Sequence, residues 1–480
     1  MGLTVTNTNA MSLLNIVNST SAKQSNTLTQ LSTGYKINRG ADNPAGLIAM
    51  KSLEAELTAV TAAIDNNARS NAMLAVADNS INEISSLLGE IETLVMASAS
   101  DAGLSAGEKA ANQAQIDQAL ASIDRIVNTT NFNGKRLLDG SQAIALTDTV
   151  DRTKIDSLRI YSRGTQTSDT QINVAVKVAA EVASTGSWGN FTGSDTLNGN
   201  MKIEITGSLG TKVIEIASGS TASEVQAAVN AVKIHTGVSA SVASEQLSLA
   251  STGYGSKEFV GVNVLEGGAT AGGNTITHHA RSYGQDGTVL INGQSVTTDG
   301  LDVYYNSAGI SFGFSMDEDN LNLANGTGTV SFTISHNKGG ATFQLGTDAS
   351  TRATLGIDSL ATHMLGGGET GGTLDQLKSG GTFSLENDTA GALKIVKKAM
   401  NDAATAQGRI GAFQKFNVQT SINTLNTAKT SLSEAKSVIG DTDFAVATAE
   451  LNRQSVLLNA GISLLGLANQ QASQILSLLG

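Results

Sequence analysis

Apolar residues recur every seven positions at both ends of the chain, and this spacing predicts a long helix at each end. A seven-residue repeat keeps one seam of a helix against a partner helix as the two wind together. We therefore predict that the two terminal helices pair along these positions, which we call the terminal seam. The terminal seam consists of Leu3, Ala10, Val17 and Leu31, with Gln24 at the intervening step, and of Leu451, Leu458, Leu465, Ala472 and Leu479.

Both terminal segments carry almost no charge, which indicates that they are buried among other helices. Lys23 is the only charged residue in residues 1–35, and none occurs in residues 454–480. A soluble helix usually presents a charged face to water. Burying the apolar side chains of the tail offsets only part of the entropy lost in ordering it. We expect the tail to be largely unfolded alone, and to gain order against the N-terminal helix and other copies of the chain.

Membrane insertion is the alternative interpretation of the apolar tail, and the residue pattern disfavours it. A spanning helix needs about twenty mostly apolar residues, whereas polar side chains interrupt this one repeatedly. An amphipathic helix on a membrane surface usually has a basic face, and the tail has none. Residues 1–6 fit the loose N-myristoylation pattern, although an acyl group there would cap the terminal seam. The interrupting residues are Asn459, Ser463, Asn469, Gln470, Gln471 and Gln474.

A second seven-residue repeat lies inside the first and predicts two further helices. The first of them starts with Asn43 as the N-cap and Pro44 at the first helical position. We expect the two to pack together in a bundle, with a shorter helix near residues 116–127 beside them. The repeat, which we call the bundle seam, consists of Leu53, Val60, Leu74, Ile81, Leu88 and Val95 in one helix and of Val418, Leu425, Leu432 and Ile439 in the other.

Between the helical ends, the chain changes to glycine-rich segments with short apolar runs, which predict strands and turns. Residues 201–250 read as a ββαβ unit whose helix begins with a capping box between Thr221 and Glu224. Strands are also expected at 289–291, followed by an Asn-Gly turn, and at 330–334. The predicted fold is therefore multidomain: an α-helical coiled-coil and bundle core built from the paired N- and C-termini, with an inserted β-rich α+β outer region.

Composition narrows the possible partners. The chain has 480 residues, no cysteine and a formal net charge of −12. Nucleic acid is disfavoured as a partner because its phosphates would be repelled. The N-terminus lacks the basic stretch and unbroken apolar run of a secretory signal peptide, so export would need another route.

Searches for catalytic and metal-binding motifs give no candidate site. All five histidines lie in the middle region, and none is part of a His-Glu-x-x-His motif. His278 and His279 are adjacent, so on a strand they point to opposite faces. Asp317–Asn320 lack the glycine and distal glutamate of a calcium loop. We expect no cofactor, no metal and no enzymatic activity.

At both ends, longer stretches of the sequence resemble the bacterial flagellin family. The resemblance covers about 140 N-terminal and about 90 C-terminal residues, in the same order as in the family. Near the N-terminus it rests on residues 31–38 (LSTGYKIN), Asp42, residues 45–47, residues 82–84 (NEI) and residues 132–140 (FNGKRLLDG); near the C-terminus it rests on residues 437–445 (SVIGDTDFA), 468–470 (ANQ) and 476–479 (LSLL). Residues 343–346 (FQLG) are similar to a run that follows soon after the first group in short flagellins.

The resemblance implies three domains in a hollow filament. Residues 1–45 with 441–480 would form the inner tube, residues 46–160 with 341–440 the surrounding long-helix bundle with a β-hairpin, and residues 161–340 the variable outer surface. It also implies that the chain polymerises into the flagellar filament for swimming motility, outside the cell. Implied partners are other copies of the chain, the flagellar cap and hook-associated proteins, and an export chaperone of the type III apparatus. The alternatives are a hook–filament junction protein and a secreted enzyme housed in the insertion.

One departure from the family lies in the long inner helix. Flagellins recognised by Toll-like receptor 5, a vertebrate innate receptor, carry two arginines flanking an apolar residue at this position. Here the positions hold Glu90, Ile91 and Glu92. The resemblance therefore implies weak recognition by that receptor, although the two carboxylates could simply pair with basic groups on a neighbouring helix or subunit.

Overall fold

The computed structural model of the chain describes residues 8–99, 105–148, 150–151, 154–155, 157–164, 168–191, 195–244, 246–267, 275–307, 309–316, 329–367 and 371–479. These residues form two compact units. Unit 1 consists of Met1–Ala68 with Thr420–Gly480, and unit 2 of Arg69–Gln419. The division differs from the three domains expected from the sequence, which stay a proposal.

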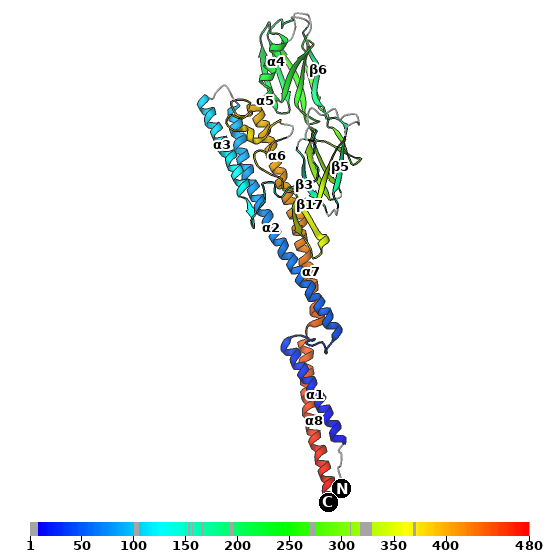
Figure 1. Ribbon diagram of the computed structural model, residues 1–480. Helices are drawn as coiled ribbons and strands as arrows, with labels where there is room; N and C mark the ends of the chain where they lie inside the picture. The colour runs from blue at the N-terminus through cyan, green and yellow to red at the C-terminus, as the bar shows by residue number, and fades with distance from the viewer. Residues whose placement is uncertain are drawn as a thin grey trace. The chain divides into compact units, whose positions relative to one another are not determined.

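Unit 1 is built from four helical segments that come from both ends of the chain. The helix α1 (Thr8–Thr33) packs along α8 (Phe444–Leu479), and the first part of α2 (Pro44–Ser98) packs against α7 (Thr420–Gly440) (Figure 1). The start of α2 is as predicted, because the Asn43 side-chain oxygen accepts a hydrogen bond from the Gly46 amide at 2.9 Å. This bond satisfies one of the free N–H groups of the first turn.

The two connections inside unit 1 are joined to each other by backbone hydrogen bonds. The Lys36 amide donates to the Gly440 carbonyl at 2.7 Å, and the Thr442 amide donates to the Gly34 carbonyl at 2.9 Å. Tyr35 and Asp441 form an antiparallel bridge between them. The α1–α2 and α7–α8 connections are therefore one local structure, in which each stabilises the other.

The helical part of unit 2 consists of the second part of α2, of α3 (Ala106–Thr129) and of α6 (Thr389–Phe413). Ser105 and Glu108 cap α3, and Asp388 caps α6. The Gln407 amide donates to the Asn82 side-chain oxygen at 2.7 Å, which joins α6 to α2. A π-helical segment, η4 (Gln414–Gln419), follows α6 directly and ends unit 2.

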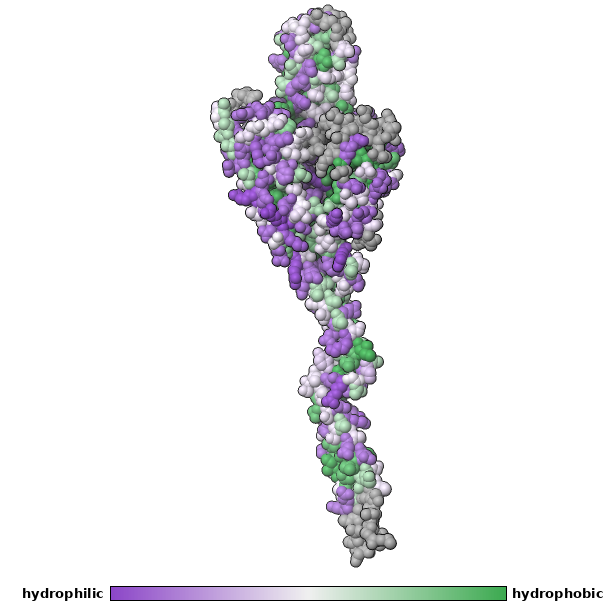
Figure 2. Space-filling model, viewed as in Figure 1, coloured by the Kyte–Doolittle hydropathy of each residue, from purple (hydrophilic) through white to green (hydrophobic). Residues whose placement is uncertain are grey.

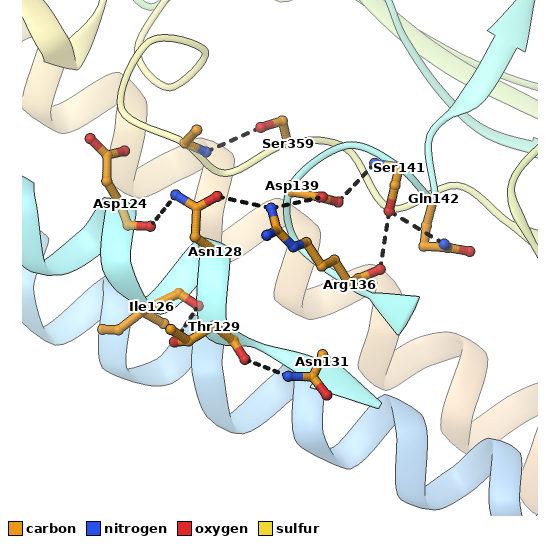
Figure 3. Close-up of polar contacts among 11 residues, drawn as sticks. Asp124, Ile126, Asn128, Thr129, Asn131, Arg136, Asp139, Ser141, Gln142 and Ser359 are labelled. Atoms are coloured by element: carbon orange, nitrogen blue, oxygen red, sulfur yellow. Dashed lines mark hydrogen bonds and ion pairs between the residues drawn. The ribbon is translucent and has the colours of Figure 1, made fainter. Parts of the chain in front are cut away.

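The chain leaves α3 through a tight hairpin of two short strands, β1 (Asn131–Phe132) and β2 (Lys135–Arg136). Asn133 and Gly134 both have positive φ, as the Asn-Gly pair predicts. Figure 3 shows how Arg136 fixes the following turn: its guanidinium donates to the Asn128 side-chain oxygen at 3.3 Å and lies 3.9 Å from the Asp139 carboxylate. The hairpin is thus tied to the end of α3.

Two sheets share one apolar core next to α6. One has five strands in the order β14-β13-β5-β17-β3, and the other has three in the order β15-β16-β4. Phe312 and Phe332 meet edge to face in this core. The predicted strands at 289–291 and 330–334 are both present, and the Asn-Gly turn follows the first. The strands are β3 (Ile144–Leu146), β4 (Arg159–Arg163), β5 (Thr170–Val178), β13 (Thr288–Ile291), β14 (Gln294–Thr297), β15 (Asp302–Ser307), β16 (Ile310–Ser315) and β17 (Thr329–Gly339).

A second apolar core lies between a four-stranded sheet, β12-β11-β7-β8, and a three-stranded sheet, β6-β10-β9. The predicted ββαβ order is present, but the last strand joins the other sheet. The helix α4 contacts both β8 and β9 and carries the chain from one sheet to the other. The elements are β6 (Val182–Asn190), β7 (Met201–Gly207), β8 (Gly210–Ile216), α4 (Ala222–Ala231), α5 (Lys233–Thr236), β9 (Val238–Ala243), β10 (Gln246–Tyr254), β11 (Phe259–Glu266) and β12 (His279–Tyr283).

The chain returns to the helices through a hairpin of β18 (Ala341–Gln344) and β19 (Arg352–Leu355), with the short helix η2 (Ala349–Thr351) between them. A further short helix, η3 (Leu374–Leu377), lies against α3. The buried Gln113 amide of α3 donates to the Leu377 carbonyl at 2.8 Å and accepts from the Leu385 amide at 2.9 Å. These bonds fix the segment that leads into α6.

Candidate functional site

The terminal seam lies at the contact between α1 and α8. Its residues in the described part of the chain are all half-buried there: Ala10, Val17, Gln24 and Leu31 on α1, and Leu451, Leu458 and Leu465 on α8. Leu3 lies outside the described residues, as do the side chains of Ala472 and Leu479. The helices therefore meet along the sequence-predicted positions wherever the side chains are described.

A second strip completes the α1–α8 contact, and sequence reasoning missed it. It follows the terminal seam at steps of three and four residues, which is the spacing of the second core position in a coiled coil. Most of its members are small or polar, so an apolar repeat could not reveal them. The strip consists of Leu13, Thr20 and Thr27 on α1 and of Ala447, Gln454, Gly461 and Ala468 on α8.

Small residues in this strip allow the two backbones to approach closely. A Cβ at position 461 would lie only 2.9 Å from Cγ2 of Val17. The Thr20 and Thr27 hydroxyls donate to carbonyls of their own helix, at 2.8 and 3.0 Å, so they add no unpaired polar group to the contact.

Apolar side chains also cover the faces of α1 and α8 that point away from the contact. Figure 2 shows this apolar surface as green areas on the pair. Exposed apolar patches of this size mark interaction surfaces, because a monomer in water gains nothing from them. We call these residues the outer face of the terminal pair: Met11, Leu14, Ile16 and Leu28 on α1, and Phe444, Val446, Val456, Leu457, Ile462, Leu464 and Leu467 on α8.

A small polar cluster lies beside the strip on α8. Arg453 forms a forked ion pair with Glu450, with the shortest N–O distance 2.6 Å. Hydrogen bonds to Glu450 hold the pKa of its carboxyl below the usual range. The bond from Arg453 has the larger effect and the bond from Gln454 the smaller. The Gln454 side chain is buried and donates to Glu450 at 2.8 Å. These are the last charged residues before the tail, so from there on the contact of α8 is uncharged.

The bundle seam is buried on α2 except at Leu53, and on its partner it is half-buried at Leu432 and Ile439. In unit 1, Val60 of α2 packs against Leu425 and Leu432 of α7, while Leu53 and Ile439 are half-buried. In unit 2, Leu74, Ile81, Leu88 and Val95 are fully buried, and so is Val418 of η4.

Glu90, Ile91 and Glu92 lie on the second part of α2. Ile91 is fully buried, Glu90 is exposed and Glu92 is half-buried. Within the described residues, neither carboxylate forms an ion pair. The intramolecular basic partner considered as an alternative is therefore not seen in the described part of this chain.

Among the described residues there is no group of three or more histidines, aspartates and glutamates that could hold a metal ion. Asp317–Asn320, the acidic turn noted in the sequence, lie outside the described residues. Among the helices of the described residues, none combines the length and the hydrophobicity that a membrane span requires.

Comparison with known families matches three parts of the chain. Residues 5–143 match the bacterial flagellin N-terminal helical region, residues 393–479 match the bacterial flagellin C-terminal helical region, and residues 202–253 match the flagellin hook IN motif. The first two contain the terminal seam except Leu3, and the whole bundle seam. The third matches the segment from β7 to β10.

Curated proteins that match over nearly their whole length are named flagellin. The chain is 25% identical to flagellin of Clostridium tyrobutyricum over 96% of this chain and 97% of the relative. It is 24% identical to flagellin of Salmonella typhimurium over 99% of each. Among solved structures, the FliC structure from Burkholderia pseudomallei is similar at 15% identity and TM-score 0.22, covering 73% of this chain and 99% of that one. Domains of the flagellar cap protein from Escherichia coli are similar at 18% identity and TM-score 0.24, covering 38% and 95%.

Proposed function

The chain belongs to the bacterial flagellin family and is a structural subunit of the flagellar filament, and from this premise we propose that α1 and α8 form its self-assembly surface. The observation that carries the proposal is the outer face of the terminal pair. Among the side chains that the structure describes, eleven large apolar ones stay exposed there although the two helices already cover each other. Burying each such side chain is worth roughly 1.5–3 kcal/mol, so association of many copies has a large driving force.

The lack of charge on the terminal pair supports close packing of identical copies. The whole chain carries a net charge of −12, so copies repel one another at a distance. Beyond Arg453, α8 contributes none of this charge. Neighbouring copies can therefore bring their tails together without burying like charges. We accordingly propose that residues 1–45 with 441–480 line the inner tube of the filament, residues 46–160 with 341–440 form the bundle around it, and residues 161–340 face outward.

Removing the tail tests this proposal. A variant that lacks residues 454–480 should form no filaments after salt is added, because five of the eleven residues of the outer face are lost. Its near-ultraviolet circular dichroism should persist, because all the aromatic residues but Phe444 and Tyr35 lie in unit 2. Filaments of normal length, seen by electron microscopy, would contradict the proposal.

The outer face of the terminal pair also suggests which proteins bind the subunit before and after assembly. Outside the filament, the apolar outer face would be exposed to water and prone to non-specific association. We propose that an export chaperone covers it before secretion, and that the cap and hook-associated proteins contact it at the two ends of the filament. We expect α1 and α8 to become ordered only when they pack against each other and against other copies of the chain. Export of an unfolded chain through a type III apparatus is consistent with this expectation.

The family is structural, and we propose no enzymatic activity for this member. The proposal rests on the lack of a catalytic motif in the sequence. Incubation of the purified protein with protein and ester substrates would detect an activity housed in the insertion.

We also propose that this flagellin is a poor ligand of Toll-like receptor 5. Its carboxylates Glu90 and Glu92 stand where recognised flagellins carry arginines. Replacing a guanidinium with a carboxylate turns a charge-assisted hydrogen bond, worth about 1.5–3 kcal/mol, into repulsion. Both carboxylates are at least partly accessible on α2.

A further inference from the structure

The helices α1 and α8 run in opposite directions and meet layer by layer. The end of α1 and the start of α8 lie at the same connection, where the Thr442 amide donates to the Gly34 carbonyl (Figure 1). Val17 and Gly461 lie at the same level, because a Cβ at position 461 would lie 2.9 Å from Cγ2 of Val17. In an antiparallel pair, each step forward on one helix is matched by a step back on the other. The residue seven positions after Val17 is therefore level with the residue seven positions before Gly461.

Two glutamines share that layer of the contact. Gln24 of the terminal seam follows Val17 by seven positions, and Gln454 of the second strip precedes Gly461 by seven. The Gln454 side chain is 5% exposed, and the Gln24 side chain is half-buried. Buried core positions of paired helices are usually apolar. This layer therefore places two amides inside a contact that is otherwise formed by apolar and small side chains.

The Gln454 side chain is held in one orientation and keeps one unused acceptor. Its Nε2 donates to the Glu450 carboxylate at 2.8 Å, and Arg453 holds that carboxylate in a forked ion pair. Its Oε1 is buried and has no hydrogen-bond partner in the described part of the chain. Amide oxygens removed from water are nearly always satisfied, because leaving one without a partner costs free energy. Gln24, level with it on α1, carries two N–H donors that can supply the missing bond.

The sizes of the other side chains do not fix the register of α1 on α8. A shift of seven residues brings the positions of a seven-residue repeat back into alignment. A shift that moves Val17 onto Ala468 keeps a small residue opposite the valine. The same shift moves Gln454 onto Leu31 and separates it from Gln24. The opposite shift places Val17 against Gln454, where a larger side chain leaves less room. Of these three registers, only the observed one brings the two glutamines together.

We propose that Gln24 donates to Gln454 in the closed contact, and that this glutamine layer selects the register in which α1 and α8 pair. A single polar core position can specify the register of a coiled coil at a cost in stability. The connection fixes the same register from one end of the pair, and the glutamine layer fixes it within the contact. A shift of seven residues would displace the α8 part of the outer face by about 10.5 Å relative to the α1 part. This last consequence rests on the proposed assembly surface, whereas the choice of register does not.

Engineered disulfides can report the register, because the natural chain has no cysteine. In the full-length chain, a flexible Gly/Ser insertion between Gly440 and Asp441, long enough to span a shift of seven residues, releases the tether at the connection. Ala10→Cys with Ala468→Cys then cross-links only in the observed register, and Val17→Cys with Ala468→Cys only in the shifted one. Each pair is equilibrated in a glutathione redox buffer. The yield of each disulfide therefore measures the stability of its register, even if the helices pair for only part of the time.

With both glutamines present, the disulfide of the observed register should be favoured at least about tenfold, which is the size of effect expected from separating two buried amides. With Gln24→Leu and Gln454→Leu, the shifted disulfide should rise to a comparable yield, although the contact becomes more apolar. Gln24→Glu with Gln454→Lys should restore the preference through an ion pair. Asn26→Leu with Asn459→Leu is the matched control, because these exposed amides lie on the same helices outside the contact and should leave the ratio unchanged.

Two results would overturn the proposal. One is an unchanged ratio in the double leucine variant, which would mean that side-chain size alone sets the register. The other is equal yield of the two disulfides while both glutamines are present, which needs no leucine variant to fold. Salt-induced assembly is scored separately: normal filaments from chains held by the shifted disulfide would contradict the assembly surface and not the choice of register.

Discussion

Val17 occupies the space that a side chain at position 461 would need: a Cβ on Gly461 would lie 2.9 Å from Cγ2 of Val17. Valine has one strongly preferred rotamer in a helix, so its methyl group cannot easily swing away. The close approach of α1 and α8 at this point therefore depends on the absence of a side chain at Gly461.

Gly461→Ala should weaken assembly, although alanine favours a helix over glycine by roughly 0.5–1 kcal/mol. The added methyl group forces α1 and α8 apart and shifts the outer face. We expect the critical concentration for filament formation, measured by sedimentation, to rise several-fold. Val17→Ala should recover part of the loss in the double variant, because the two sites are in contact. A lower critical concentration for Gly461→Ala alone would mean that helix propensity, not close packing, governs this position.

The stability of unit 2 should fall as the pH rises through about 6, because of Asp358. Asp358 follows β19 in unit 2, and burial raises its pKa from the ordinary 3.8 to about 6, so the folded state favours the neutral acid. The stabilisation is complete below about pH 3.8 and is lost as the pH rises through 6. Asp358→Asn should raise the free energy of unfolding at pH 7 by about 3 kcal/mol and change it little near pH 4.

Urea unfolding at both pH values measures this effect. Asp302→Asn is the contrasting variant, because it leaves Lys398 buried without its partner and should destabilise the protein by about 3 kcal/mol at pH 7. Equal stability of Asp358→Asn and the natural protein at pH 7 would show that the Asp358 carboxylate is adequately solvated.

The β-rich region should be removable at a point that the structure defines. The Gly340 amide donates to the Ala143 carbonyl at 3.1 Å, so the chain enters and leaves this region at adjacent positions. Joining Ala143 to Gly340 with a short Gly/Ser linker removes β3 to β17 without leaving a strand unpaired. We expect filaments that are thinner than the natural ones. A soluble, helical variant that never polymerises would show that the removed region makes essential contacts between subunits.

The helices could be predicted from the sequence because each has a local signal. The seven-residue repeats, the Asn43-Pro44 start and the Ser105–Glu108 cap act within a few residues of each other. The pairing of distant elements has no such signal. β3 pairs with β17 across 188 to 195 residues, and the ion pair of Arg159 with Asp402 spans 243. No local signal could therefore show that β3, which precedes residue 161, pairs in one sheet with β17.

Only part of the α1–α8 contact could likewise be predicted from the sequence. The large apolar positions of the terminal seam stand out in the sequence. Thr20, Thr27 and Gly461 complete the contact through small size and through hydrogen bonds within their own helix, so hydrophobicity cannot reveal them. The outer face was implied only by the absence of charge, which does not identify the side chains that stay exposed.

Replacing Glu90 and Glu92 with arginine should raise recognition by Toll-like receptor 5. The two exchanges remove repulsion and restore two charge-assisted hydrogen bonds, which together are worth at least a hundredfold in affinity. Ile91 between them is buried and should be left unchanged. Receptor-reporter cells dosed with purified monomer measure the effect. High potency of the natural protein, unchanged by the double exchange, would refute the idea.

The role of the outer face can be tested without disturbing the contact between α1 and α8. Ile462 and Leu464 are exposed on α8, so Ile462→Gln with Leu464→Gln keeps the terminal seam and the helix propensity. Val213→Gln, at an exposed apolar position on β8, is the matched control. The measurement is the critical concentration for salt-induced assembly, with electron microscopy of the products. We predict at least a tenfold rise or no filaments for the α8 variant, and no change for the control. An unchanged critical concentration for the α8 variant would contradict the assignment of the terminal pair as the assembly surface.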